Sequence, residues 1–293
     1  MKTASVKVNI DKLEHIFKEL IKKFNYQELE PKNVYEYKRL RNEDSTLVIY
    51  RSGKIVLRGE NIEEIEDFLL TFSNLKNYEG YSTLIGIDET GKGELFGPIV
   101  ICGVRIIKNQ KNIEKAISTM DTKSNRYSIE RYKNLFDKLI ELGVIFEIEE
   151  IQPIETLPRT LNRLMFDKCI NILDKLTSNY SDNGRIVIDN FGINQKEIEF
   201  ISERYKNYEV IIESKSDENY LECKTASLLS RYHREKIMED INKRYSVDGI
   251  EPGSGNIGNL QTKKWLKKWI ELEGTIPYFV KRWDKVIKKL LEE

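Results

Sequence analysis

TLIGIDETGKGELFGP, residues 83–98, is the stretch of this sequence that decides how the remainder is interpreted. Its first residues are apolar and predict a buried strand, and its glycines and proline cannot continue a strand or a helix. Asp88 and Glu89 therefore stand where the strand ends, which is where α/β sheets build their sites. A buried carboxylate is costly unless it is protonated, paired or bound to a cation, so this pair, with Lys92 close behind, indicates a divalent metal site. A solvated acidic turn is the alternative, and the two residues alone do not decide between them.

The glycines of residues 91–97 do not fit a nucleotide-binding loop. Their spacing is GxGxxxG rather than GxGxxG, and the chain contains no GxxxxGK[ST] run. In a dinucleotide site the acidic ribose ligand lies well downstream of the glycines, whereas here the acids precede them. A nucleotide-binding enzyme is therefore only a third alternative for the function.

Two further apolar runs are followed by acids. Residues 185–189 read RIVID, and residues 210–217 read VIIESKSD. Acids at the ends of neighbouring parallel strands converge at one edge of a sheet, so Asp189 and Asp88 together form a candidate metal cage. Taken alone, Asp189 would be a turn residue, and Asp217 would be an acid favoured by the dipole at a helix N-terminus.

These segments resemble the type 2 ribonucleases H in order and in content. IDETGKGELFGP is similar to the first catalytic motif of that family, residues 121–123 (DTK) to its Asp-Ser-Lys motif, and residues 215–217 (KSD) to its Lys-x-[Asp/Glu] motif. The resemblance covers about residues 83–285. It implies that the catalytic and metal-binding residues are Asp88, Glu89, Asp189 and Asp217, with Mg²⁺ or Mn²⁺ as the cofactor.

The resemblance also implies contacts with the substrate. Gly91, Lys92 and Gly93, by close approach of their backbone, would read the ribose 2′-hydroxyl that separates RNA from DNA. Lys123 and Asn162 are expected to contact the substrate. Asp121, which precedes a predicted helix, is better explained as a helix cap.

The implied activity is that of a ribonuclease H endonuclease that cleaves the RNA strand of RNA/DNA hybrids. In the two-metal mechanism one cation makes hydroxide from water and the other stabilises the leaving 3′-oxygen, which gives 5′-phosphate and 3′-hydroxyl ends. Asn256 stands where ribonuclease HII carries a tyrosine that recognises the junction between a ribonucleotide and DNA. We therefore favour ribonuclease HIII, with an HII-type enzyme that excises single ribonucleotides as the alternative. A binding module without turnover is a further alternative.

The N-terminal residues predict a small α+β domain with the element order β-α-β-β-β-α. A strand near Val6–Ile10 is followed by a helix at Asp11–Phe24, a three-stranded meander at 34–41, 46–51 and 53–58, and a helix at 62–72. This order resembles the TATA-binding-protein-like domain that precedes the catalytic domain of ribonuclease HIII.

One face of this predicted sheet carries cations and aromatic rings. The side chains that we expect to project from it are Tyr35, Tyr37, Arg39, Arg41, Tyr50, Lys54 and Arg58. Such a face suits nucleic acid, because cations meet phosphates and rings stack or pack on sugars. An ordinary solvated sheet face is the alternative. We predict an α/β protein: a substrate-binding domain at 1–75, a linker at 76–81, and a ribonuclease H-like mixed-sheet catalytic domain at 82–293.

Composition limits the remaining functional classes. The 48 Lys and Arg residues equal the 48 Asp and Glu residues, so a nucleic-acid surface must arise from local segregation of charge. Three isolated cysteines suit a reducing compartment, and no apolar run is long enough to span a bilayer. We expect a cytoplasmic protein without a membrane partner, acting as a monomer on an RNA/DNA hybrid.

Overall fold

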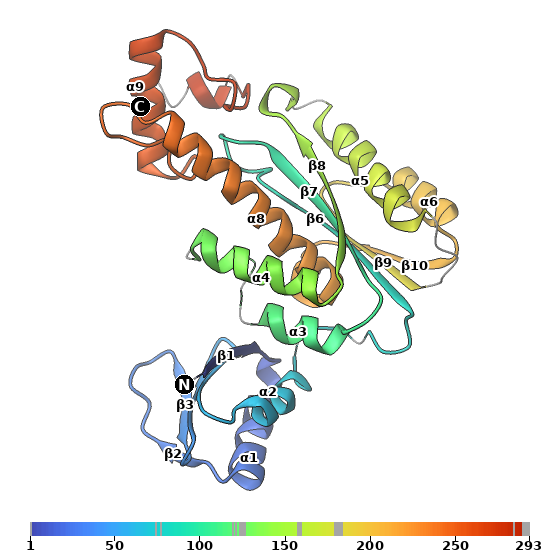
Figure 1. Cartoon of the computed structure of the whole chain (residues 1–293), viewed down its shortest axis with the longest axis vertical. Coiled ribbons are helices and arrows are strands. Elements are labelled where there is room, and N and C mark those ends of the chain that lie inside the picture. The colour runs from blue at the N-terminus through green and yellow to red at the C-terminus, as the bar shows by residue number, and fades with distance from the viewer. Residues whose placement is uncertain are drawn as a thin grey trace. The chain divides into compact units, whose positions relative to one another are not determined.

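The computed structural model describes residues 2–73, 75–76, 78–118, 120, 122, 127–156, 160–178, 184–283 and 285–288. Contacts within the chain divide it into two compact units (Figure 1). The N-terminal unit takes in the chain up to residue 77 and a later segment that carries helix α3 (Gln110–Ser118), and the C-terminal unit takes in the rest. The predicted α/β class is confirmed, because the C-terminal unit contains a mixed five-stranded sheet. None of the described helices has the length and apolar composition needed to cross a bilayer.

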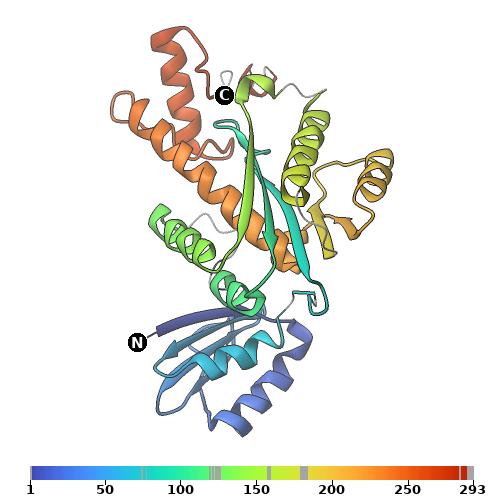
Figure 2. The same cartoon turned by 45° about the vertical axis from the view of Figure 1, so that its right-hand side comes forward.

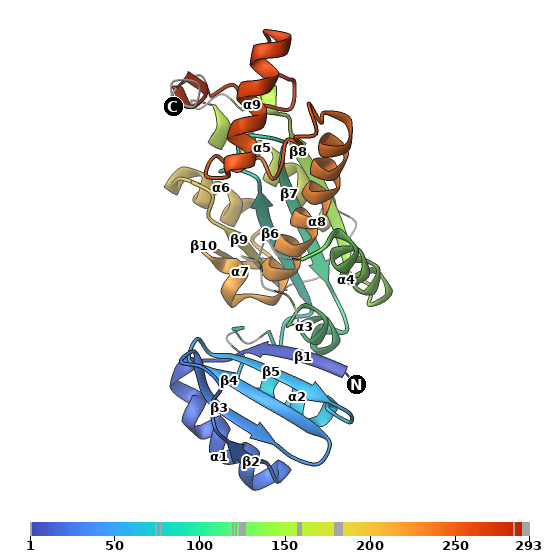
Figure 3. The same ribbon diagram turned by 90° about the vertical axis from the view of Figure 1, so that its left-hand side faces the viewer.

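The N-terminal unit is built on a five-stranded antiparallel sheet of order β1-β5-β4-β3-β2 (Figure 3). Its strands are β1 (Lys2–Lys7), β2 (Gln27–Leu29), β3 (Glu36–Arg41), β4 (Ser45–Tyr50) and β5 (Lys54–Gly59). After a 3-10 turn at Ile10–Lys12, α1 (Leu13–Phe24) packs with α2 (Glu63–Leu70) on one face of the sheet. The three strands of the predicted meander are present, and the short strand β2 is an addition to the predicted order.

Helix α3 completes the core of the N-terminal unit although it lies within the segment predicted to be catalytic. Ile113 and Ile117 are fully buried. Lys115 forms ion pairs with Glu66 and Asp67 of α2 at 3.3 and 3.1 Å. The periodicity of α3 predicts a helix but gives no indication of which unit the helix joins.

The side-chain register of strand β3 differs from the prediction at Tyr37. A β-bulge between Glu36 and Lys38 shifts the pairing with β4, so that Tyr37 turns towards the helices. Its hydroxyl donates a 2.6 Å hydrogen bond to Glu14 of α1, and its ring packs against the core. The predicted outward position of Tyr37 is therefore wrong, because a bulge reverses the alternation that the prediction assumed.

The sheet of the C-terminal unit has the order β10-β9-β6-β7-β8. Strands β6, β9 and β10 are parallel, and β7 and β8 are antiparallel to their neighbours. The strands are β6 (Thr83–Thr90), β7 (Ile99–Ile106), β8 (Ile145–Ile151), β9 (Gly184–Asp189) and β10 (Tyr208–Glu213). The helices are α4 (Ile129–Glu141), α5 (Leu161–Thr177), α6 (Gln195–Arg204), α7 (Ser216–Asn219), α8 (Leu221–Arg244) and α9 (Leu260–Glu273), with a 3-10 turn at Pro153–Glu155.

Helices cover both faces of this sheet (Figure 2). On one face, α5 and α6 pack on Ile85, Ile87, Ile186 and Ile188 of the central strands. On the other face, the long helix α8 lies directly against β6, because Gly86 has no side chain to hold it away. A Cβ atom at Gly86 would lie 2.2 Å from the Glu222 carbonyl carbon. The helix is therefore seated on the strand that carries the first two acids.

We expect Gly86→Ala to destabilise the protein by about 3 kcal/mol, because the new methyl group would meet helix backbone rather than a side chain that can move. The midpoint of urea unfolding should fall at an unchanged m-value. Gly93→Ala is the matched control, since a Cβ atom there would meet nothing within 4 Å. Equal midpoints for the two variants would contradict the close approach of α8 to β6.

Candidate active site

Strand register brings the first and second acidic segments together. In the parallel pair β6 and β9, Ile87 lies opposite Ile188, so Asp88 and Asp189 occupy the next position on neighbouring strands. Oxygen atoms of Asp88, Glu89 and Asp189 lie within 4.8 Å of one another. The predicted convergence of strand-end acids is thus present for these three residues.

Burial makes this cluster electrostatically expensive when no cation is bound. Asp88 is only 5% exposed, and burial, followed by the charge of Glu89, raises the pKa of Asp88 well above its ordinary value. Burial and then Asp189 raise the pKa of Glu89 to about 7. Among the described residues, none donates a hydrogen bond to the buried Oε2 atom of Glu89. The charge of Lys92 lowers the pKa of Glu89 but does not offset the burial and the neighbouring acids, so the cluster as a whole remains short of positive charge.

Asp217 lies beside the cluster rather than inside it. It is not one of the three residues whose oxygens meet, but its charge contributes to the raised pKa values of Asp88, Glu89 and Asp189. The turn between β10 and α7 connects it to the site, because Oδ1 of Asp189 accepts a 2.7 Å hydrogen bond from the Ser216 amide. Lys215 in this turn has a left-handed backbone, with φ at 64°.

Helix α8 supports the two acidic strands from the opposite face. The thiol of Cys223 donates to the carbonyls of Ile87 and Val187, at 3.4 and 3.2 Å, and so links β6 to β9. One helical turn later, Ser227 donates a hydrogen bond to the carboxylate of Asp88. Sequence reasoning missed Ser227. The only signal for it was the run of small residues in which it stands.

The glycine-rich loop after β6 is joined to the end of β9 by Lys92. Its ammonium group donates to the Phe191 carbonyl and, at 3.3 Å, to Oδ1 of Asn162 on α5. A Cβ atom at Gly192 would lie 2.7 Å from Nδ2 of the same asparagine, which shows how closely α5 approaches this edge. Two of the predicted substrate contacts, Lys92 and Asn162, thus touch each other. Lys123 lies outside the described residues.

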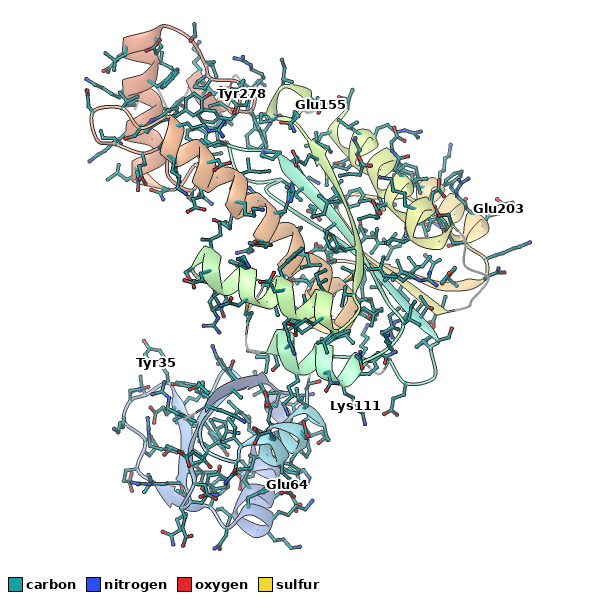
Figure 4. All side chains as sticks on the ribbon, in the orientation of Figure 1. Tyr35, Glu64, Lys111, Glu155, Glu203 and Tyr278 are labelled. Carbon is teal, nitrogen blue, oxygen red and sulfur yellow. The ribbon has the colours of Figure 1, made fainter. Side chains whose placement is uncertain are left out.

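The remaining predicted contacts belong to the N-terminal unit. Arg41, Lys54 and Arg58 are exposed on the sheet face away from α1 and α2. Arg39 lies on that face too, but its guanidinium forms a bidentate pair with the buried Glu36, at 2.6 and 3.0 Å. Two tyrosines lie at the margins of the predicted face. Tyr35 precedes β3, is 74% exposed and points away from the unit (Figure 4), and Tyr50 is half-buried at the end of β4.

The donor set at the sheet edge fits a divalent cation. Three carboxylates offer hard oxygen ligands of the kind that Mg²⁺ and Mn²⁺ take in proteins. The buried oxygen of Glu89, which no hydrogen bond satisfies among the described residues, and the mutual repulsion of the acids would both be relieved by positive charge. The described residues therefore include a site with the composition and geometry of a metal centre.

Comparisons with known proteins agree with this geometry. The family model Ribonuclease HII matches residues 85–285. Ribonuclease HII of Methanococcus aeolicus is 32% identical over 72% of this chain and 82% of its own length. Among solved structures, ribonuclease H2 of Pyrococcus horikoshii OT3 is 26% identical, covers 72% of this chain and 97% of its own, and has a TM-score of 0.58.

A solved structure of Bst-RNase HIII, described as a complex with Mn²⁺, extends the likeness in fold to both units. It covers 99% of this chain and 98% of its own, with a TM-score of 0.60 and 17% identity. The mixed sheet of the C-terminal unit is thus ribonuclease H-like, as predicted. The three acids that meet at its edge all lie within the residues that the family model matches. The chain therefore belongs to the ribonuclease HII family and is a ribonuclease H enzyme.

Proposed function

We propose that this protein is an endonuclease that hydrolyses the RNA strand of RNA/DNA hybrids and leaves 5′-phosphate and 3′-hydroxyl ends. The observation that carries the proposal is the cluster of buried Asp88 with half-buried Glu89 and Asp189, whose oxygens lie within 4.8 Å of one another. Asp217 is the fourth member of the proposed catalytic and metal-binding set. The charge of Asp217 contributes to the raised pKa values of the other three acids.

The side chains of the site have distinct tasks in this proposal. Bound Mg²⁺ or Mn²⁺ would supply activation of water and stabilisation of the leaving oxygen. Asp88 and Asp189, fixed on neighbouring strands, would hold the ions, with Glu89 and Asp217 completing the set. The hydrogen bond from Ser227 would hold the Asp88 carboxylate in a fixed orientation. Gly91, Lys92 and Gly93 would place backbone groups against the ribose 2′-hydroxyl, and Lys92 and Asn162 would position the neighbouring backbone.

Two subclasses of substrate remain to be separated by experiment. The matched family model and the curated relative carry the name ribonuclease HII, which favours cleavage at single ribonucleotides as a second candidate function. We favour the HIII-type activity on continuous hybrids because Asn256 replaces the junction tyrosine. Its side chain is exposed, and its Oδ1 accepts a 2.8 Å hydrogen bond from the Gly258 amide. Tyr220 cannot replace the missing ring, since it is 2% exposed and lies against Arg185.

A cleavage assay on a uniform RNA/DNA hybrid tests the central proposal. Cleavage is expected with Mg²⁺ or Mn²⁺ and should be lost in EDTA, with product ends that a ligase and a phosphatase can identify. Cleavage that persists in EDTA would refute the metal-dependent assignment. Binding without cleavage under any of these metals would favour a silent binding module. The proposal includes a monomer acting in the cytoplasm, where free buried cysteines such as the three found here stay reduced.

The exposed cations of the N-terminal sheet are proposed to bind the hybrid backbone. We expect the triple variant Arg41→Gln, Lys54→Gln, Arg58→Gln to weaken hybrid binding and to lower the salt slope by about 0.9 for each phosphate contact that is lost. The rate of cleavage at saturating substrate should change little. The readout is the binding constant measured between about 50 and 200 mM salt, because phosphate contacts make affinity fall steeply over this range.

Lys18→Gln with Lys22→Gln is the control for this test, because both lysines lie on α1 at the opposite face of the sheet. Point variants are preferable to deletion of residues 1–75, which would remove the packing partners of Ile113 and Ile117 on α3. If the sheet-face variant and the helix variant have the same affinity and salt slope, the sheet face is ordinary surface.

A further inference from the structure

A lysine far away in the sequence is buried beneath the glycine-rich loop. Lys281 is fully buried, and its ammonium group donates hydrogen bonds to the carbonyls of Gly91 and Glu94. Its own amide donates to the Leu95 carbonyl at 2.9 Å. The segment that carries Lys281 also pairs with the end of the loop, through an antiparallel bridge between Val280 and Phe96. Lys281 thus contacts the beginning and the middle of the loop at once.

The environment of Lys281 is that of a cation enclosed by carbonyl groups and aromatic surface. In the described part of the chain no carboxylate lies within ion-pair distance of its ammonium, which sits 5.1 Å from the centre of the Trp283 ring. The charges that act on its pKa are those of Arg234 on α8 and Glu94 in the loop. Burial and then Arg234 lower the pKa of Lys281 to about 7, while Glu94 acts in the opposite direction. A buried ammonium without an ion-pair partner is costly, so its hydrogen bonds to the loop carbonyls must offset that cost.

The hydrogen bond from Lys281 to the Gly91 carbonyl fixes the orientation of the peptide group between Gly91 and Lys92, which by the proposed function faces the substrate. The described part of the chain contains no cis peptide bonds, so a carbonyl at Gly91 that faces Lys281 directs the Lys92 amide the opposite way. Charge on the donor also polarises that peptide and makes its amide a stronger donor. On the far side, the Lys92 side chain already reaches the Phe191 carbonyl, two residues after Asp189. The loop is therefore held on both sides.

Arg234 supports the other end of the same loop. Its guanidinium donates to the Phe96 carbonyl at 2.9 Å and to the Ser254 carbonyl at 3.3 Å. A Cβ atom at Gly91, where φ is 90°, would lie 2.8 Å from Nε of Arg234. Two buried cations thus lie under one loop, and of the two only Lys281 contacts the Gly91 carbonyl.

We propose that Lys281 is a positioning residue that fixes the turn from Gly91 to Glu94 and thereby sets the discrimination between ribose and deoxyribose. The inference rests on the proposed reading of the 2′-hydroxyl by this loop and adds the residue that keeps the loop in its reading conformation. Lys281 touches neither the acids nor, by this proposal, the substrate.

The test compares Lys281→Met with Val280→Ala in the full-length protein with Mg²⁺. Methionine keeps the length of the side chain and removes the donor, whereas Val280→Ala loosens the same segment and keeps the lysine. For Lys281→Met we expect KM for the hybrid to rise about tenfold with a smaller change in kcat, and the preference for hybrid over DNA duplex in binding to fall about tenfold, which corresponds to about 1.4 kcal/mol. Val280→Ala should retain the wild-type preference.

The outcomes separate this inference from the proposed function. Failure of the wild type to prefer the hybrid would refute the proposed function itself. A wild type that discriminates, alongside a Lys281→Met variant that discriminates equally well, would refute the role of Lys281 alone. The same loss in Val280→Ala would show that packing, and not the ammonium, sets the preference. If Lys281→Met does not fold, Lys281→Gln keeps one amide donor, and full loss of preference without a change in melting temperature would still support the role.

Stability as a function of pH checks the placement of Lys281. Its pKa is lowered on folding, so the unfolded chain binds more protons between about pH 7 and 10 and the wild type gains stability as pH rises through that window. Lys281→Met lacks this gain. The melting temperature of the wild type relative to the variant should therefore increase from pH 7 to pH 10. A constant difference would mean that the ammonium is solvated and would overturn the inference.

Discussion

Asp88→Asn is expected to reduce hybrid cleavage by about a thousandfold or more, while hybrid binding stays close to that of the wild type. The variant removes a charged oxygen ligand from the centre of the acidic cluster and leaves the loop and the N-terminal sheet unchanged. A bound metal ion stabilises the transition state by several kcal/mol, and each 1.36 kcal/mol corresponds to a factor of ten in rate. Single-turnover cleavage and binding in the same buffer measure the two effects separately.

Glu213→Gln is the matched control for this variant. Glu213 ends β10 opposite Asp189 but is not among the three residues whose oxygens meet. We expect its replacement to change the cleavage rate by less than about tenfold, because no metal ligand is removed. If Asp88→Asn retained turnover near that of the wild type with metal still required, the catalytic assignment of the cluster would be lost.

The metal-free protein provides a second readout of the same variant. The pKa values of Asp88 and Glu89 are raised on folding, so the folded state binds more protons than the unfolded chain at mildly acidic pH. The contribution of these two acids to stability is therefore full below about pH 4 and is lost as pH rises to about 7, where Glu89 ionises. Asp88→Asn should weaken this fall and should abolish most of the stabilisation that Mg²⁺ or Mn²⁺ gives at neutral pH. Melting curves with and without metal test both points.

The ratio of cleavage on a continuous hybrid to cleavage at one ribonucleotide in duplex DNA is expected to exceed ten. By the proposed correspondence with ribonuclease HII, Asn256 presents an amide where an aromatic ring would stack at the junction. Stacking on an aromatic side chain contributes about 1–3 kcal/mol per base, which corresponds to about one to two decades in rate. Asn256→Tyr should raise cleavage of the single-ribonucleotide substrate by a similar factor and should affect the continuous hybrid less.

Asn256→Ala is the control, because it removes the hydrogen bond to the Gly258 amide without adding a ring. The loop around Asn256 is tied to the glycine-rich loop by the 2.8 Å bond from the Leu95 amide to the Gly255 carbonyl, so a new ring would lie close to the substrate-reading segment. Equal efficiency of the unaltered protein on both substrates would assign it to the HII-type junction enzymes instead.

The sequence was sufficient to predict what depends on local pattern. The strand ends at Asp88 and Asp189 follow from apolar runs that stop at acids, and the parallel register then places the two side by side. The same reasoning fails where a single residue alters the pattern. The bulge before Lys38 turns Tyr37 to the helix side, and the three residues of β2 are too few to show an alternation.

Long-range contacts were the part that sequence reasoning could not reach. Lys281 is 190 residues away from Gly91, and no periodicity connects a C-terminal lysine with a turn near residue 91. Ser227 stands in an ordinary helical run, and only the seating of α8 on Gly86 brings it to Asp88. Such residues become visible when the topology is known, because their role depends on which element packs against which.

The membership of α3 in the N-terminal unit has a consequence for synthesis on the ribosome. The N-terminal core is complete only after Ser118 has left the ribosome, and the entire apolar hairpin of β6 and β7 emerges before that point. That hairpin must wait for α5, β9 and α8, which are all encoded later, before its two faces and the edge of β6 are covered. The nascent chain therefore exposes the unpaired edge of β6, a strand of the future active site, from the emergence of β7 until the emergence of β9. We expect chaperones to bind the nascent chain mainly during this interval, and we expect slower translation of this interval to increase aggregation.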